Sequence, residues 1–127
     1  MADPAQVIRN LNAAWLEGRY DALRRYFAPD VVMLPPGGHE PVTGVDSMID
    51  SYREFGSLGE IHGFEVLGLI VHEFGPLAVC EMTFAIDYEI EAKRFKERGM
   101  EVYVLDTSGD EPHVVWRTQI PGATSCA

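Results

Sequence analysis

Apolar residues in the first part of the chain recur at the spacing of a helix. The first such stripe consists of Val7, Ile8, Leu11, Ala14 and Trp15. Asp3 is placed to cap this helix, Pro4 suits its first turn, and Gly18 can take the left-handed conformation that ends a helix. The pattern therefore predicts an amphipathic helix that begins at Pro4 and ends near Gly18.

Three shorter elements are predicted between Gly18 and Gly59. Residues 20–27 favour a short helix, and residues 31–34 form an apolar strand that ends at two prolines. Thr43 and Asp46 have capping spacing for a third helix, which Gly56 and Gly59 would close.

The pattern changes after Gly59, where β-branched and aromatic residues alternate with polar ones. Residues 61–74, 77–90, 99–106 and 113–120 are predicted strands, and compact turn sequences separate them. The basic segment 91–98 is expected to be the solvated end of a hairpin rather than a binding patch. Helices followed by strands predict an α+β fold, with three N-terminal helices packed on one face of a curved antiparallel sheet.

The predicted strand 61–74 is apolar on both of its faces. Strict alternation places Phe64, Val66 and Ile70 on one face. It places Leu67, Leu69 and Val71 on the other face. Because the helices can cover one face of the sheet only, we expect a homodimer built through the other face.

Length and charge narrow the classes of function. The 127 residues, 46% of them hydrophobic, suit a single domain over 1–127, with a core at about 5–121 and a tail at 122–127. Ten basic residues against twenty acidic ones give a net charge of −10. Such a chain is not expected to bind nucleic acid or an anionic membrane, since both are negatively charged.

The termini and the cysteines point to a cytoplasmic protein. The first residues lack the basic and apolar regions of a signal peptide, and no apolar run approaches the roughly 20 residues of a bilayer span. Cys80 and Cys126 have no framework or metal-binding spacing, so both are expected to be reduced thiols.

The order of the predicted elements resembles the nuclear transport factor 2-like superfamily, in particular its small SnoaL-like and ketosteroid-isomerase-like members. The residues that carry the resemblance are Trp15, Gly18-x-x-Asp21-Ala22-Leu23, Phe27-Ala28-Pro29-Asp30-Val31-Val32, Gly44 and Trp116-Arg117-Thr118-Gln119. The resemblance implies a cystatin-like cone, in which the helices and the concave face of the sheet enclose a pocket. It does not imply one reaction, because this fold is used by isomerases, cyclases, dehydratases and noncatalytic modules.

The isomerase chemistry of the resembled family does not carry over to this chain. Its carboxylate base would fall at Leu34-Pro35, and its tyrosine donor would fall at Leu11. Glu101 alone matches the family's acidic partner. Without the base, the steroid isomerase reaction is not expected.

A polar set on the predicted strands is the candidate site. If the mixed face of the strand 77–90 is concave, Glu81 and Thr83 point into the pocket, where the following strands would add Glu101, Tyr103, Arg117 and Gln119. We expect Glu81, Glu101 and Arg117 to be catalytic, since an arginine between two carboxylates separates their pKa values. The alternative is a charge ladder on the outer face, because a slip of one residue in register inverts a strand.

Two aromatic residues of the helices, Trp15 and Tyr52, are expected to line the pocket, with Thr83, Tyr103 and Gln119 as the other substrate-binding residues. No metal site is predicted, because His62 and His72 would lie roughly 33 Å apart on one strand. No cofactor is expected either, because no phosphate-binding loop precedes a helix.

Two functions remain open from the sequence. The first is a cofactor-independent isomerase, cyclase or dehydratase that takes a small apolar, carbonyl or carboxylate ligand. The second is a noncatalytic ligand-binding or dimerisation module.

Overall fold

The computed structural model describes residues 3–37 and 40–126, without the side chains of 123–126. Its elements are α1 (Pro4–Leu16), the 3-10 helix η1 (Tyr20–Arg25), β1 (Phe27–Leu34), β2 (Val42–Thr43), α2 (Val45–Leu58), β3 (Gly59–Phe74), β4 (Leu77–Ile90), β5 (Lys93–Asp106) and β6 (His113–Cys126). No helix among the described residues is sufficiently long and apolar to cross a membrane.

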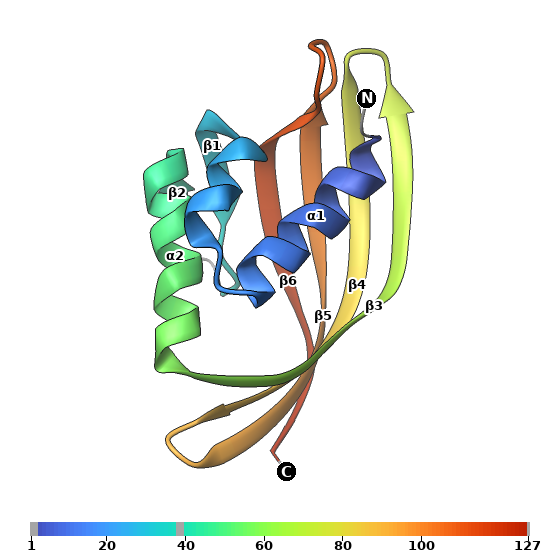
Figure 1. Ribbon diagram of the computed structural model, residues 1–127. Helices are drawn as coiled ribbons and strands as arrows, with labels where there is room; N and C mark the ends of the chain where they lie inside the picture. Colours follow the sequence, from blue (N-terminus) through green and yellow to red (C-terminus); the bar gives the residue numbers. More distant parts are fainter. Residues whose placement is uncertain (1–2, 38–39, 127) are drawn as a thin grey trace.

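Six strands form one curved sheet in the order β2-β1-β6-β5-β4-β3. All neighbours are antiparallel except β1 and β6, which run in parallel. The helices lie against one face, and the far end of the β4–β5 hairpin bends beneath α2 (Figure 1). The α+β class and the curved sheet are therefore confirmed.

The helical part matches the predicted pattern with two corrections. Asp3 caps α1 by accepting a hydrogen bond from the Gln6 backbone. The second predicted helix is a 3-10 helix that ends at Arg25, so that Phe27 already belongs to β1. The third helix begins at Val45 after Gly44, with no side-chain cap from Thr43.

The β4–β5 hairpin corrects the prediction for the basic segment 91–98. Lys93 pairs with Ile90, so most of this segment belongs to β5 and the turn contains two residues. Those residues, Glu91 and Ala92, both have positive φ, at 51° and 65°. The last strand is also longer than predicted, because β6 continues through the expected tail to Cys126.

Irregular pairing in β3 changes the predicted partition of its apolar residues. Register shifts between Ile61 and Gly63 and between Val66 and Gly68 interrupt the alternation. As a result, Leu69 and Val71 pack against the core together with Phe64. Ile70 lies on the opposite face, opposite Glu81 of β4.

The core lies between the helices and the inner face of the sheet. Ile8, Leu11, Leu23, Met48 and Tyr103 are among its fully buried side chains. Cys80 is buried there as a free thiol, and burial raises the pKa of this thiol to about 11. The side chain of Cys126 lies outside the described residues.

Candidate functional site

Strand register determines which polar residues meet on the inner face. Cys80 of β4 pairs with Tyr103, which pairs with Arg117 of β6. In the same way, Met82 pairs with Glu101, which pairs with Gln119. Because Cys80 and Met82 are fully buried, these two rows direct Glu101, Tyr103, Arg117 and Gln119 towards the helices.

Glu81 and Thr83 lie on the outer face, so the predicted set is divided between the two faces of the sheet. The Nε2 atom of His72 lies 2.6 Å from Oε2 of Glu81, and Thr83 lies opposite Gly68. The apolar residues of β4 take the inner positions instead. The mixed face of β4 is therefore not the concave one, and Glu81 does not join Glu101 and Arg117.

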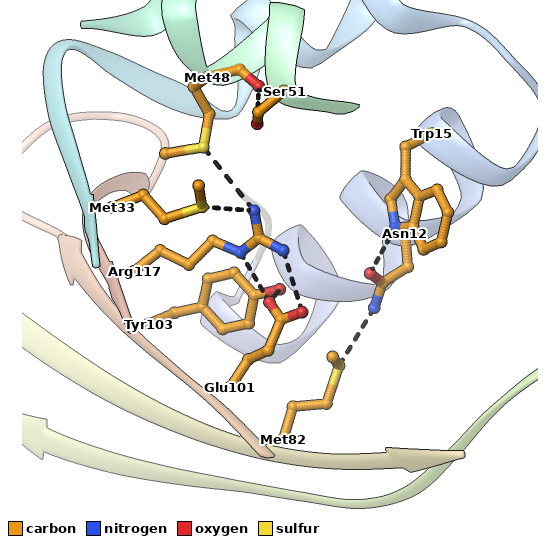
Figure 2. Close-up of polar contacts among 9 residues, drawn as sticks. All are labelled: Asn12, Trp15, Met33, Met48, Ser51, Met82, Glu101, Tyr103 and Arg117. Carbon is orange, nitrogen blue, oxygen red and sulfur yellow. Dashed lines mark hydrogen bonds and ion pairs between the residues drawn. The ribbon is translucent and has the colours of Figure 1, made fainter. Parts of the chain in front are cut away.

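Glu101 and Arg117 form a buried, bidentate ion pair (Figure 2). Nε of Arg117 donates to Oε2 of Glu101 at 2.7 Å, and Nη2 donates to Oε1 at 2.9 Å. The hydroxyl of Tyr103 donates to the same carboxylate. Every oxygen of Glu101 thus accepts a hydrogen bond within the protein.

Burial and attraction act in opposite directions on this pair. Burial alone would raise the pKa of Glu101, but the nearby Arg117 charge and the hydrogen bonds to the carboxylate lower it below its ordinary value. Burial and the negative charge of Glu101 raise the pKa of Tyr103 well above its ordinary value. At neutral pH the site therefore contains a carboxylate, a guanidinium and a neutral phenol.

The remaining side of Arg117 faces weak partners. Its Nη1 atom lies 3.2 Å from the sulfur of Met33 and 3.7 Å from that of Met48. Its Cζ atom lies 4.7 Å from the centre of the Tyr52 ring. Thioethers are poor acceptors, so Arg117 keeps capacity to donate to a bound molecule.

Tyr52 is the least satisfied polar group of the site. Its hydroxyl is buried and has no hydrogen-bond partner among the described residues. Its neighbour is the Tyr103 hydroxyl, which donates to Glu101. Burial raises the pKa of Tyr52 above its ordinary value, so the phenol remains protonated and can donate.

A cavity of about 280 Å³ lies next to this cluster. Its walls are mostly aromatic and apolar, and its lining residues are Trp15, Met33, Ser51, Tyr52, Phe55, Phe64, Phe84, Ile86, Glu97, Glu101, Arg117 and Gln119. Three of the five predicted substrate-binding residues, Trp15, Tyr52 and Gln119, are among them. Tyr103 is not among the lining residues, and Thr83 lies on the outer face.

A hydrogen-bonded chain from α1 to the sheet fixes one wall of the cavity (Figure 2). The indole of Trp15 donates to Asn12 at 3.0 Å, and the amide of Asn12 donates to the sulfur of Met82 at 3.2 Å. Trp15 also packs edge-on against Phe64. Asn12 was not predicted, although a polar residue within an apolar helical stripe was a signal for it.

Sequence reasoning also missed the wall residues from β3, β4 and the bent hairpin, notably Phe64, Phe84 and Glu97. The alternation of β4 did group Phe84 and Ile86 on one face. It did not indicate that this face, rather than the mixed one, is concave. Glu97 was hidden because its segment was predicted to be the solvated end of a hairpin, outside the strand 99–106.

One group among the described residues has metal-ligand geometry, away from this cavity. The ligand atoms of Glu60, His62 and Glu89 lie within 4.8 Å of one another. His62 Nε2 lies 3.1 Å from Oε1 of Glu89, and the carboxylate of Glu60 is largely exposed. We assign no metal to this solvent-facing cluster of side chains.

Solved structures with the same fold cover almost the whole chain. A nuclear transport factor 2-like protein of unknown function in nutrient uptake from Rhodospirillum rubrum is 16% identical, with a TM-score of 0.77 over 96% of this chain and 100% of that one. A proposed scytalone dehydratase from Novosphingobium aromaticivorans is 10% identical, with a TM-score of 0.79 over 94% of this chain and 82% of that one. The β subunit of benzoate 1,2-dioxygenase from Burkholderia mallei is 13% identical, with a TM-score of 0.75 over 96% and 92%.

At these identities the likeness establishes the fold and not the activity. No curated protein matches the chain significantly. The model of the SnoaL-like domain, however, matches residues 8–110, from the first helix to the turn before β6. The chain therefore belongs to the SnoaL-like domain family and has the nuclear transport factor 2-like fold.

Proposed function

We propose that this protein binds and orients a small cyclic ligand in the cavity between α1, α2 and the inner face of the sheet. The observation that carries the proposal is an aromatic cavity with buried hydrogen-bond donors at one end. A pocket lined by apolar side chains with a few convergent polar groups is typical of small-molecule sites.

The donors define the chemistry of that end. Arg117 and Tyr52 both line the cavity; Nη1 of Arg117 meets only thioether sulfurs, and the Tyr52 hydroxyl has no partner among the described residues. A ligand oxygen of a carbonyl or carboxylate group would accept from both residues. Leaving a buried hydroxyl unsatisfied costs about 1–3 kcal/mol, so a ligand that pairs with Tyr52 would recover this cost.

Binding accounts for the site better than catalysis. An isomerase, cyclase or dehydratase needs a group that is free to exchange a proton. Glu101 is held in its ionised form by Arg117 and accepts hydrogen bonds at both oxygens. Glu81, the other carboxylate of the predicted catalytic set, lies on the opposite face of the sheet. The names of two similar structures, a dehydratase and a dioxygenase subunit, leave catalysis as the second candidate.

The outer face supports the proposed homodimer. Its exposed apolar residues include Ile70, Phe74, Leu77, Trp116 and Ile120, which come from three strands. A second copy of the chain would cover this face without closing the cavity on the other side. We place this dimer in the cytoplasm, where the free thiol of Cys80 would remain reduced.

Filling the cavity tests the proposed binding function. Ser51 lines the cavity and its hydroxyl donates to the Met48 carbonyl oxygen. Ser57 lies on the same helix, is exposed, and makes the same bond to the carbonyl oxygen of Glu54. The Ser51→Phe and Ser57→Phe variants therefore make the same change and lose the same local hydrogen bond, but only the first reduces the cavity.

The probe is the neutral bicyclic ketone 1-tetralone, and its binding is measured by isothermal titration calorimetry. We expect the wild type and Ser57→Phe to bind it equally, and Ser51→Phe to bind it at least tenfold more weakly. Equal binding by all three proteins, or no binding by the wild type, would contradict the proposal.

A further inference from the structure

The cavity has a second polar end, formed by Glu97. Glu97 lies on β5 four residues before Glu101, so both side chains are on the inner face, and both line the cavity. At about 3.3 Å per residue, their positions along the strand are about 13 Å apart. The two residues therefore line the same wall of the cavity at well-separated positions along β5.

The space between these two ends is apolar. Gly99 lies midway along the strand, and a Cβ atom there would come within 2.9 Å of the Phe84 ring. The absence of a side chain thus allows the Phe84 ring to cover this part of β5. Phe84 stacks on Phe64 with ring centres 5.6 Å apart, which extends the aromatic wall to β3.

Glu97 has one carboxylate oxygen without a partner among the described residues. The hydroxyl of Tyr88 donates to Oε1 of Glu97. No other hydrogen bond or ion pair to Glu97 occurs among the described residues, which do not include the Thr124 side chain opposite it, and Oε2 is the oxygen that a bound molecule would meet. Tyr88 stacks on Phe95 and packs against Phe55 of α2, and these contacts hold the pair in place.

The charges of the cavity sum to −1. Its charged lining residues are Glu97, Glu101 and Arg117, and the last two neutralise each other. A ligand carboxylate would therefore meet an arginine that is already paired and a second carboxylate that repels it. In a partly desolvated site, such repulsion is stronger than in water.

We propose that Glu97 determines specificity by accepting a hydrogen bond from a hydroxyl or ammonium group of the ligand. This inference rests on the proposed binding function and narrows its ligand class. The ligand has a flat apolar body, a carbonyl oxygen at the Arg117 end, a hydrogen-bond donor at the Glu97 end, and no carboxylate.

Three probes that differ at one position test this inference. They are 1-tetralone, 6-hydroxy-1-tetralone and 1-tetralone-6-carboxylate, which share the ketone and differ at the far end of the ring system. For the wild type we expect the hydroxyl to tighten binding about tenfold relative to 1-tetralone, as a hydrogen bond to a charged group does. We expect the carboxylate to weaken binding at least tenfold.

The variant Glu97→Gln removes the charge and keeps the acceptor for Tyr88. It should bind the carboxylate probe at least tenfold better than the wild type does and lose most of the preference for the hydroxyl probe. Glu89→Gln is the matched control, because Glu89 lies on the adjacent strand β4 and does not line the cavity. It should leave all three affinities unchanged.

The outcomes separate the two proposals. If the wild type binds 1-tetralone but binds the carboxylate as tightly as the hydroxyl compound, the role of Glu97 is overturned and the binding function stands. If 1-tetralone does not bind the wild type, both proposals fall. The wild-type comparison needs no variant, so misfolding of Glu97→Gln would not obscure the result.

Discussion

Each face of the sheet holds side chains that are unusual for its environment. The inner face buries an ion pair, Glu101 and Arg117, which are 6% and 5% exposed. The outer face leaves large apolar side chains in solvent, with Phe74 63% exposed and Ile70 57% exposed. A monomer selected for stability alone would reverse this distribution, since a buried ion pair is often no better than apolar packing and exposed apolar patches promote association.

This distribution is what the proposed ligand site and the proposed homodimer would each require. Charge in the core is useful where a small molecule must be oriented, and apolar surface is useful where a large partner must be held. Three experiments test this distinction, and the largest effect is expected on the inner face.

Replacement of Arg117 by Met should lower the free energy of unfolding by about 3–5 kcal/mol at pH 7, because it leaves Glu101 buried and unpaired. In the wild type, the lowered pKa of Glu101 contributes stability above its unfolded value near pH 4.3, and this contribution is lost as the pH falls through the folded pKa. In the variant the shift of the Glu101 pKa has the opposite sign, because burial without Arg117 raises that pKa. The loss in free energy of unfolding relative to the wild type should therefore be smaller at pH 5 than at pH 7 in urea unfolding experiments.

The double variant Glu101→Gln with Arg117→Met is the control for this experiment. It removes both charges and keeps an acceptor for the Tyr103 hydroxyl, so it should recover most of the lost stability. If the single variant is as stable as the wild type at pH 7, the pair is not buried in solution as described.

On the outer face, Ile70→Lys should weaken the proposed homodimer at least tenfold while leaving the protomer folded. An ammonium group in an apolar interface must be desolvated without a partner. Light scattering at a series of micromolar concentrations measures the change. Leu16→Lys is the control, since Leu16 is exposed at the end of α1, outside the sheet. A monomeric wild type would exclude the dimer and leave the apolar face unexplained.

The smallest effect is expected for Tyr52→Phe. Removal of this hydroxyl, which has no partner among the described residues, should raise the free energy of unfolding by about 1 kcal/mol, since a buried donor without a partner is costly. The same change should weaken binding of 1-tetralone severalfold. Opposite changes in stability and affinity would identify a donor kept for the ligand. A loss of stability instead would mean that the hydroxyl is satisfied within the protein.

The parts of the fold that were predicted correctly depend on local signals. The cap at Asp3, the stripe of α1 and the strand boundaries at Gly75 and Pro76 were all readable from neighbouring residues. The hairpin turn at Glu91 and Ala92 was not readable, because neither residue is typical of a turn with two positive φ angles. That one omission concealed the first half of β5, and Glu97 with it.

The candidate site was half predicted for a related reason. Residue alternation grouped Glu101 with Tyr103 and Arg117 with Gln119, because residues two apart on a strand share a face, and strand pairing brings the two pairs together. It could not decide whether Glu81 shares that face, since the answer depends on pairing between distant strands. Met82, rather than Glu81, lies opposite Glu101, and this register is a property of the assembled sheet.

The place of β6 in the sheet has a consequence for the order of folding during synthesis. β6 lies between β1 and β5, and it follows the other elements in the chain. Until β6 leaves the ribosome, β1 lacks its parallel neighbour and Glu101 lacks Arg117. The sheet must therefore close around its last strand, and ordering of the strands and neutralisation of the buried charge should occur in the same late step.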